Sequence, residues 1–514
     1  MKKKYLTKKA MLSGILCACL TLSGCVSSVQ PSQGQVTLPP SYVSYTAPTG
    51  DSDIRRDQTV KLYVPDADGI RLVPVETTVS LNPFRWYAQE LAEALFDYEG
   101  AEGQQFPGYE SLFLNNVNPV EVSCGIATVN LNTAALSLSH EDLYTIFQAL
   151  ANTLCQFGDI HGVNLLIGGM QPGIDVASQS PAGTLSQNLT DDLSALWARA
   201  ASVREAAAAN RRITSTATLY FPAVSGAGVL AEARALVFQN ASIPRLARTL
   251  LEALSEGPRE VHAKAVPYLA DLLSTLPSVS ESGGERILTL RFNKELTARL
   301  QESGIPLSCL AASLCLTMTT FLPGINGVTV YIGTERLNSL TQEGTFQGAG
   351  TTLAFPAGVM RRSLFSVYVL GECRLYFASG DSLVEVRRAV PWHETLSPRY
   401  LIQELCQGPR YDDSVQGLSP TLPEDMSDSH LLGVTLSARD SVLILNFSSD
   451  TLDRLRAMDG KAARRMLYAM VNTLCENRRI RETCFFFGGK QAAALDDGLE
   501  LSGTFLPNPT ITRK

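Results

Sequence analysis

The acidic turn Asp66-Ala67-Asp68-Gly69 is the first place in the sequence where residue types and spacing suggest chemistry. Asp-x-Asp followed by Gly begins many calcium loops, but an EF-hand needs its Gly at position six and a bidentate Glu at position twelve. Here the Gly stands at position four and Glu76 at position eleven. The equivalent turns of two related segments lack the acidic pair. The pattern therefore predicts a hairpin turn between two strands rather than a metal site.

Histidines and nucleophiles form no catalytic arrangement in this sequence. The five histidines occupy unlike positions in the related segments: His140, His161, His262, His393 and His430. Ser139 is typical of a helix N-cap. No G-x-S-x-G elbow and no H-E-x-x-H helix occurs, so hydrolase and zincin chemistry have no signature. Gly168-Gly169 and Gly488-Gly489 follow strands without a phosphate-binding motif, which favours strand-end turns. We predict no catalytic, cofactor-binding or metal-binding residue.

The cysteines after residue 25 fit no metal or redox motif. They are Cys124, Cys155, Cys309, Cys315, Cys373, Cys406, Cys475 and Cys484. No C-x-x-C pair occurs, and no cysteine stands beside a histidine at ligand spacing. Cys155, Cys315 and Cys475 sit in apolar helical patterns, which favours free, buried thiols. Disulfides remain the alternative in an exported chain, and the pair to test first is Cys475 with Cys484.

The first 25 residues indicate export and lipidation. A lysine-rich start precedes an apolar run at Ala10–Leu22, which is shorter than the about 20 residues needed to cross a bilayer. Leu22-Ser23-Gly24-Cys25 resembles the bacterial lipobox, in which the cysteine thiol receives a diacylglycerol before cleavage. We expect residues 1–24 to be a signal peptide, Cys25 to carry the lipid, and the protein to lie on the extracytoplasmic face of the cell membrane. An ordinary signal peptide that contains a cysteine is the alternative.

The composition of the rest of the chain is that of a globular protein. Residues 25–57 are rich in Ser, Pro, Gln, Gly and Thr and predict a flexible tether. The full chain has 45% hydrophobic and 18% charged residues, and its length suffices for roughly three domains. Its net charge of −7 argues against nucleic-acid binding, because phosphate neutralisation needs a basic surface.

One unit recurs three times in the mature sequence. Tyr63, Tyr220 and Tyr376 stand in matching short β-type runs, spaced by 157 and 156 residues. Each run leads into the order β-β-α-β-β-α-β, which predicts an α+β fold. Each copy is then a small α/β sandwich with its helices on one face of a mixed sheet. The predicted domains are residues 58–170, 213–335 and 363–514. The predicted linkers are residues 171–212, with a helix at 193–210, and residues 336–362, which are expected to be loop.

The aligned copies also share local patterns. Strands at residues 126–131, 287–292 and 442–447 alternate in part between apolar and polar residues, as a strand covered on one face does. The first helix of the second and third copies stops at Gly257-Pro258 and Gly408-Pro409, where Gly takes a left-handed cap and Pro cannot continue. In the long helix, Asn152-Thr153-Leu154-Cys155 of the first copy matches Asn472-Thr473-Leu474-Cys475 of the third. The corresponding stretch of the second copy is Ser313–Phe321.

These motifs resemble a known family. Leu62–Gly69 and Leu72–Glu76 resemble the opening of the GerM-type domain of sporulation and spore germination proteins, and Gly125–Leu131, Val163–Gly169 and the Gly-Pro stops match the same pattern. The second copy is the most diverged, and a third copy departs from members with one or two. The resemblance implies an exported, often lipidated protein of spore-forming bacteria without enzymatic activity. It also implies domains similar to the ring-building modules of the secretion-like apparatus between mother cell and forespore.

We therefore expect a structural or assembly role in sporulation or germination. The expected partners are the membrane through diacylglycerol on Cys25, envelope or sporulation-apparatus proteins, and a second copy of the chain, but not nucleic acid. The alternative is a cell-wall (peptidoglycan) binding module, whose aromatic candidates are Trp86, Trp197 and Trp392. A basic run at residues 464–481 is interleaved with glutamates, which favours a solvated face over an anionic-lipid patch.

Overall fold

The computed structural model describes residues 45–100, 119–173, 180–259, 262–342, 350–437, 439–495 and 498–513. Residues Thr46–Lys514 form one compact unit. The signal segment 1–24 and Cys25 lie outside the described residues, so the lipidation site stays a prediction. The domain boundaries also stay predictions, although the element order can be compared directly.

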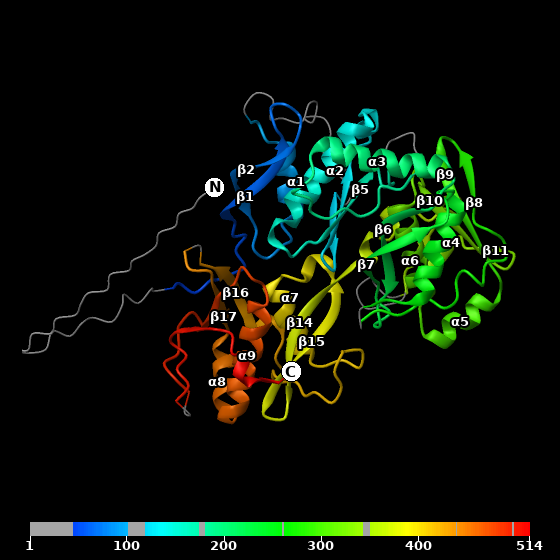
Figure 1. Ribbon diagram of the computed structural model, residues 1–514. Coiled ribbons are helices and arrows are strands. Elements are labelled where there is room, and N and C mark those ends of the chain that lie inside the picture. The colour runs from blue at the N-terminus through cyan, green and yellow to red at the C-terminus, as the bar shows by residue number, and fades with distance from the viewer. Residues whose placement is uncertain are drawn as a thin grey trace, which may run out of the picture. The chain divides into compact units, whose positions relative to one another are not determined.

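Three copies of one element order follow each other in this unit (Figure 1). The first consists of β1 (Arg56–Pro65), β2 (Leu72–Leu81), α1 (Ala88–Phe96), β3 (Val120–Ser123), β4 (Ile126–Leu131), α2 (His140–Leu154) and β5 (Gly162–Ile167). The second consists of β6 (Ile213–Pro222), β7 (Val229–Phe238), α4 (Ile243–Glu256), β8 (Ser278–Ser282), β9 (Glu285–Phe292), α5 (Glu295–Ser303), α6 (Leu307–Phe321) and β10 (Gly327–Ile332). The third consists of β14 (Leu370–Ser379), β15 (Ser382–Pro391), α7 (Pro398–Gln407), β16 (Leu431–Leu436), β17 (Val442–Phe447), α8 (Ser449–Ala457), α9 (Gly460–Cys475) and β18 (Glu482–Phe487). The α+β fold is confirmed, with α5 and α8 as additions that the sequence patterns did not indicate.

Each copy combines a mixed sheet with a separate hairpin. In the first copy β3 and β4 pair antiparallel, and β4 and β5 pair parallel because the long helix α2 carries the chain back across the sheet. The same pattern recurs in β8-β9-β10 and β16-β17-β18. The hairpins β1-β2, β6-β7 and β14-β15 form ladders of their own, and each copy surrounds its own hydrophobic core.

One hydrogen bond fixes the hairpin on the long helix in all three copies. The backbone N–H of Tyr63 donates to Oγ1 of Thr153 at 3.1 Å, and that of Tyr376 donates to Thr473 at 3.2 Å. In the second copy the N–H of Tyr220 donates to Oγ1 of Thr317 at 3.0 Å. A strand edge that faces a helix has no ladder partner for its N–H groups, and the threonine hydroxyl supplies one. The bond identifies the second copy as a true repeat despite its divergence.

The neighbouring asparagine has a second repeated role, in the first and third copies only. Asn152 accepts from the N–H of Asn188 at 2.7 Å and donates to its carbonyl at 2.9 Å. Asn472 makes the same two bonds to Asn508, at 2.9 and 3.4 Å. The second copy has buried Leu316 before Thr317 and therefore lacks this clamp. Asn-Thr is thus a structural pair rather than a reactive one.

A returning segment closes each mixed sheet, and in the first two copies it lies in residues that the sequence assigned to linkers. Leu185 bridges β5 at Val163, and Met360 bridges β10 at Val328, both antiparallel. In the third copy β19 (Thr504–Phe505) pairs antiparallel with β18, and β20 (Thr512–Arg513) pairs parallel with β15. A single bridge or a two-residue strand leaves no periodic pattern, which is why the sequence did not indicate it.

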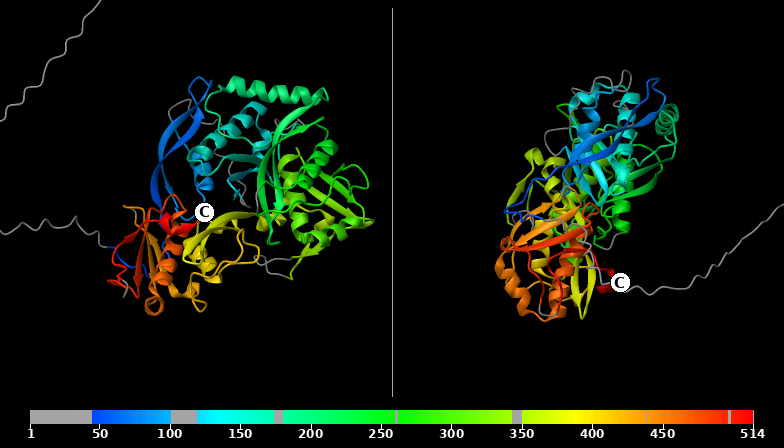
Figure 2. Two further views of the ribbon diagram at one scale, coloured as in Figure 1. Left: turned by 60° about the horizontal axis from the view of Figure 1, so that its bottom comes forward. Right: turned by 90° about the vertical axis from the view of Figure 1, so that its left-hand side faces the viewer.

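The expectation of loop at residues 336–362 is wrong in part. The short strands β11 (Glu335–Arg336), β12 (Ser339–Thr341) and β13 (Thr352–Ala354) lie in or beside this stretch, with β12 and β13 paired antiparallel. Strands of two or three residues are too short to show alternation. The other linker does contain the expected helix, α3 (Leu193–Ala208). Figure 2 shows α3 bridging the first and second copies along one side. Its Leu193, Leu196 and Ala200 are buried.

The segment before β1 is packed on the third copy, which corrects the prediction that the tether extends to residue 57. Ser52 N–H donates to Val434 O on the edge strand β16 at 3.1 Å, and Ile54 packs against the third core. Asp51 holds Arg399 through two bonds of 2.6 and 2.7 Å. A Cβ atom at Gly433 would lie 2.6 Å from Gly50 N, so glycine permits this close approach.

Two strands that were expected to have one solvated face are buried on both. All residues of β4 and β17 are buried. The polar face of β4 lies against the second copy, and Asn446 of β17 donates to Pro48 O of the segment before β1. In β9 exposure alternates as predicted. The polar residues of β4 and β17 therefore line interfaces between parts of the unit.

Among the described residues no single helix is both long enough and apolar enough to cross a bilayer. The helices α5 and α6 pass the test only when joined across a 106° bend.

Replacing Thr317 by valine tests the repeated hydrogen bond. Valine keeps the shape but leaves the Tyr220 N–H buried without an acceptor, so we expect a loss of about 1–3 kcal/mol in the free energy of unfolding. Thr319→Val is the matched control, because the Thr319 hydroxyl donates only to Cys315 O within the same helix. Denaturant titration of both variants measures the difference. Equal losses would contradict the role given to Thr317.

Candidate functional site: the junctions between the repeats

A buried polar network joins the first copy to the second. Asn164 of β5 donates to Thr218 Oγ1 of β6 at 3.0 Å and accepts from Thr184 Oγ1 at 2.7 Å. Thr184 and Thr218 lie 2.8 Å apart through their hydroxyls, and Thr128 meets the Tyr220 hydroxyl at 3.4 Å. Each of these side chains is buried, so each needs its partner. These hydrogen bonds therefore fix one relative position of the first and second copies.

An ion pair is buried at the edge of this network. Arg362 donates to the carboxylate of Glu121 and, at 2.6 Å, to Thr320 Oγ1. A further bond of 3.2 Å reaches the Tyr220 hydroxyl. Arg362 is 7% exposed and Glu121 is 5% exposed. Arg362 follows Met360, whose bridge to Val328 fixes where the chain leaves the second copy. The pair thus couples the end of the second copy to the first.

Ser123 touches all three copies with one atom. Its hydroxyl accepts from Ala231 N–H of β7 at 3.0 Å and donates to Leu370 O of β14 at 2.5 Å. Ser123 is 3% exposed and ends β3 of the first copy. A hydroxyl group can both donate and accept a hydrogen bond, whereas a methyl group in its place could do neither. The three copies therefore contact one another at this residue and do not form an extended row of separate domains.

Arg479 joins the third copy to the first, which overturns the expectation of a solvated face at this position. Its Nη1 donates to Arg85 O at 2.8 Å and to Pro83 O at 3.4 Å. Its guanidinium lies 4.9 Å from the centre of the Tyr87 ring, a cation–π contact. Asn477 donates to Pro83 O at 2.9 Å beside it. By contrast, Arg478 and Arg481 are exposed, as expected.

The tryptophans serve packing rather than an open aromatic platform. Trp86 donates through Nε1 to Trp392 O at 3.2 Å and to Thr395 Oγ1 at 3.0 Å, linking the first copy to the third. Trp197 of α3 donates to Thr145 Oγ1 of α2 at 3.1 Å. The indole N–H groups of Trp86 and Trp197 are thereby satisfied within the protein. The three residues do not gather on one face for sugar stacking.

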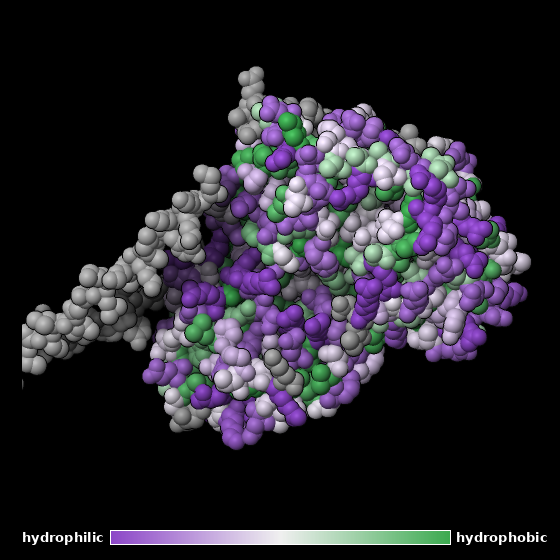
Figure 3. Space-filling view, in the orientation of Figure 1, coloured by the Kyte–Doolittle hydropathy of each residue, from purple (hydrophilic) through white to green (hydrophobic). Residues whose placement is uncertain are grey.

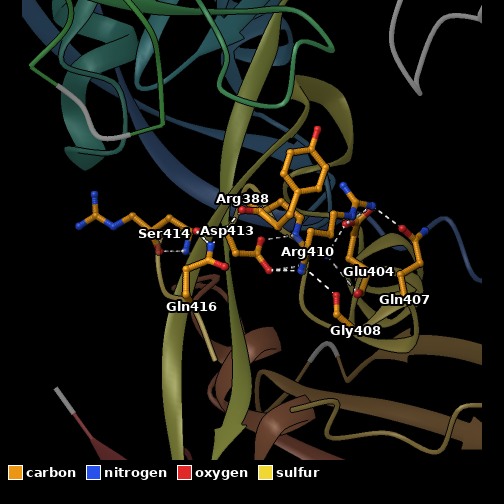
Figure 4. Close-up of polar contacts among 10 residues, drawn as sticks. Arg388, Glu404, Gln407, Gly408, Arg410, Asp413, Ser414 and Gln416 are labelled. Carbon is orange, nitrogen blue, oxygen red and sulfur yellow. Dashed lines mark hydrogen bonds and ion pairs between the residues drawn. The ribbon is translucent and has the colours of Figure 1, made fainter. Parts of the chain in front are cut away.

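Arginine replaces the predicted left-handed cap at the helix stops (Figure 4). Gly408 has φ 74° and ψ −174°, a region open essentially to glycine alone but outside the left-handed helical well. Its carbonyl accepts from Arg388 Nη2 at 2.9 Å, and Glu404 O accepts from Nη1 at 3.3 Å. Asp413 and the Glu404 carboxylate neutralise the arginine, and all three side chains are 1% exposed. The arrangement is a helix cap with an internal counter-charge.

The second copy repeats this cap and the first copy lacks it. Arg234 donates to Gly257 O at 2.8 Å and to Ala253 O at 3.4 Å, with Glu232 as its carboxylate. Thr77 occupies the matching register position in the first copy, where no Gly-Pro stop occurs. Sequence reasoning missed these arginines. One sequence feature could have revealed them. An arginine stands at the same position of the second hairpin strand in the two copies that carry a Gly-Pro stop, and in those two copies alone.

A cleft of about 750 Å³ opens beside this cap. Residues of all three copies line it, among them Glu121, Ser225, Trp392, Tyr411 and Arg410. Tyr411 is 83% exposed at the rim, whereas the Glu404 carboxylate in the wall is held by Arg388 and Arg410. A carboxylate with two cationic partners does not act as a free base. The cleft can hold a polar ligand against aromatic rings.

The predicted turns have the expected structure. Oδ1 of Asp66 accepts from Ile70 N–H at 2.7 Å and from Arg71 N–H at 3.2 Å, so the acidic turn is a hairpin turn. The strand-end interpretation of the Gly-Gly pairs is also confirmed, because the N–H groups of Gly169 and Gly489 donate to Asn130 and Asn446. Ser139 accepts from Asp142 N–H as the N-cap of α2. Within the described ranges no group of three or more potential metal ligands gathers.

The eight cysteines of the described segments are thiols outside any disulfide, including Cys475 and Cys484. Burial raises the pKa of the thiols of Cys155, Cys406 and Cys484 to about 11. A thiol with so high a pKa carries little thiolate at neutral pH and is a poor nucleophile. The five histidines lie apart: His262 faces Glu372 at 3.7 Å, and His430 faces Asp450 at 3.5 Å.

Comparison with known proteins identifies the repeats. The family described as "Germane: Sporulation and spore germination" matches residues 61–173 and 374–493, which span the first and third copies. These two repeats are Germane domains. The second copy lies outside the matched residues but shares the Thr–Tyr hydrogen bond of both Germane domains. Its divergence includes the loss of the asparagine clamp.

Two solved structures are similar in sequence over parts of the chain. The tandem GerMN domains of the sporulation protein GerM from Bacillus subtilis are 18% identical, and the match covers 58% of this chain and 99% of that one at a TM-score of 0.22. A putative lipoprotein from Clostridium perfringens is 22% identical, with 27% and 89% covered and a TM-score of 0.18. No curated protein matched the chain. At these TM-scores the superpositions carry no weight for the arrangement of the Germane domains here.

The buried ion pair gives a test of how the copies are joined. Removing one charge of a buried pair strands the other, so Glu121→Leu and Arg362→Met should each lower the free energy of unfolding by about 3–5 kcal/mol. The double variant removes both charges together and should lose clearly less than the sum of the two. Denaturant unfolding followed at the first and second copies separately measures the effect. Additive losses would show that the pair does not couple the copies.

Proposed function

We propose that this protein is a membrane-anchored, exported lipoprotein that serves as an assembly component in sporulation or spore germination. Germane domains imply a role related to sporulation or germination, and the finer assignment is our inference. The observation that carries it is the junction at Ser123, where one hydroxyl connects all three repeats. Interlocked repeats display several hairpins and helix faces in fixed relative positions. A scaffold for other proteins needs that property, whereas a catalyst needs reactive groups.

The chemistry of the described residues supports binding over catalysis. The buried carboxylates of Glu404 and Asp413 are neutralised by Arg388. The buried Glu121 is neutralised by Arg362. Loss of one member of such a buried pair leaves the other charge uncompensated and is strongly destabilising, so each member is needed to keep the fold. We therefore assign these groups to holding the scaffold together.

The hairpin of the first copy offers one face to partners. Strand β2 pairs only with β1 among the described strands, whereas the matching strand β15 also pairs with β20. Side chains along β2 alternate between exposed and half-buried. An open strand edge accepts an added strand from another chain. We infer that envelope proteins, or a second copy, contact the scaffold at β2.

Replacing Cys25 by serine tests the anchor and the role together. We expect the full-length variant to lose its lipid and leave the membrane fraction, because serine cannot form the thioether. Cells of the native host that carry only this variant should form or germinate spores less efficiently. Cys17→Ser and Cys19→Ser are matched controls in the same segment and should leave both properties unchanged. Fractionation, lipid labelling and counts of heat-resistant and germinated spores measure the outcome, and a variant that stays membrane-bound would overturn the assignment.

The cleft beside Arg410 favours cell-wall binding as a second candidate function. Its rim carries Tyr411, and Trp392 lines its wall, so a sugar ring can stack there although the tryptophans form no platform. If the cleft binds glycan, Tyr411→Ala should abolish co-sedimentation with purified peptidoglycan. Tyr268→Ala changes another exposed tyrosine outside the cleft, which is 62% exposed, and serves as the control. Equal sedimentation of both variants would remove this candidate.

A further inference from the structure

A groove between the first and third copies is lined by arginines from separate parts of the chain. It has a volume of about 710 Å³. Five arginines line it, together with Asp57: Arg55, Arg56, Arg478, Arg479 and Arg481. Hydrophilic side chains gather along this boundary in Figure 3. The sequence showed only the last three of these arginines, interleaved with glutamates. The fold adds two more from the segment that enters β1.

Hydroxyl and carbonyl oxygens are among the groups that orient the two inner arginines. Arg56 donates to Ser441 Oγ at 3.0 Å and to Ser437 O at 2.9 Å. Arg479 donates to the carbonyls of Pro83 and Arg85. Carbonyl and hydroxyl acceptors orient a guanidinium without cancelling its charge. Burial lowers the pKa of Arg479 below its ordinary value, although Tyr87, Asp159 and Glu90 act in the opposite direction.

Carboxylates around the groove offset only part of this charge. Asp57 lies in its wall, Asp159 faces Arg478 at 3.5 Å, and Glu90 lies near Arg55 and Arg479. The Asp159–Arg478 pair is weak, because the Arg478 side chain is 76% exposed and solvent screens it. The arginines therefore outnumber these acids on a chain whose net charge is −7. Arg55, Arg478 and Arg481 point exposed side chains into solvent.

The groove also lies next to the segment before β1, which leads back along the chain to the expected lipid anchor. Arg55 and Arg56 end the segment that packs on the third copy. Cys25 precedes Arg55 by 30 residues, so even a fully extended chain would separate them by no more than about 100 Å. A membrane that holds the lipid is within reach of the groove. Arginine forks match phosphate oxygens in paired hydrogen bonds.

We propose that this groove binds the phosphate headgroups of anionic phospholipids in the membrane that holds the anchor. The proposal rests on the anchoring at Cys25 proposed above. Contact at the groove would orient the scaffold on the membrane, with the junction of the first and third copies facing the lipid. The attraction is electrostatic and falls as salt screens it over a Debye length of about 10 Å at 0.1 M.

The test measures binding of a chain that starts at residue 26 to lipid vesicles. This chain lacks the anchor but retains residues 46–514, which form a compact unit by themselves. The groove variant carries Arg55→Gln, Arg478→Gln and Arg481→Gln, three exposed arginines whose loss spares the inner contacts. The control carries Arg211→Gln, Arg456→Gln and Arg464→Gln, which make the same change of charge at exposed positions outside the groove. Vesicles of phosphatidylglycerol are compared with vesicles of phosphatidylcholine.

We expect the unaltered chain and the control to bind phosphatidylglycerol vesicles, weakly at high salt, and to ignore phosphatidylcholine. Each arginine near an anionic surface contributes about fivefold in affinity, so the groove variant should bind on the order of 100-fold more weakly. Equal binding by the groove variant and the control would overturn the proposal. Binding abolished by inorganic phosphate, but not by chloride at equal ionic strength, would show a site for free phosphate and overturn the membrane assignment.

Failure of this proposal is separable from failure of the anchor. If Cys25→Ser releases the full-length protein while the two triple variants bind vesicles equally, the anchor stands and the groove proposal falls. If Cys25→Ser leaves the protein in the membrane fraction, the anchoring assignment fails whatever the vesicles show. Thermal unfolding of both triple variants verifies that neither lost its fold.

Discussion

A buried polar group must find a hydrogen-bond partner, and this requirement governs how the three repeats fit together. Thr128, Asn164 and Thr218 face each other across the first junction and satisfy one another. Ser123 has one donor and one acceptor function, and each is used by a different copy. A displacement of any copy by one residue would leave several of these groups unpaired, at a cost of about 1–3 kcal/mol each. Apolar surfaces alone would tolerate such sliding.

The repeats differ where their surroundings differ. The Thr–Tyr hydrogen bond is present in all three copies because every hairpin must seat on its long helix. The arginine cap occurs only with a Gly-Pro stop, since that stop turns helix carbonyls toward the second strand. The second copy dispenses with the asparagine clamp, and its buried Leu316 fills that position with apolar contacts instead.

The arrangement also assigns distinct characters to the surfaces of the unit. The junction of all three copies carries a cleft with aromatic and charged walls. The junction of the first and third copies carries the arginine groove, next to the segment that leads back toward Cys25. Strand β2 offers an edge without a partner strand among the described residues. A scaffold held at a membrane needs one surface for the lipid and others for proteins, and these three features are separate in the fold.

Local patterns in the sequence determined the elements. The spacing of Tyr63, Tyr220 and Tyr376 revealed the repeats, and the order of strands and helices followed from periodicity within each copy. The hairpin turn at Asp66 and the N-cap at Ser139 followed from side chains that bond their own neighbours in the chain. These features depend on contacts a few residues apart. The sequence could therefore specify them without knowledge of the fold.

Only the tertiary structure decided what the polar residues do. Arg479 appeared to belong to a solvated basic run, but the fold stacks it on Tyr87, almost 400 residues earlier in the chain. The alternating pattern of β4 indicated one solvated face, yet the second copy covers that face. Arg55 and Arg481 share a groove because two distant segments meet there. The polarity of a residue shows that it needs a hydrogen-bond partner. That partner is either water or another protein group, and only the folded chain determines which.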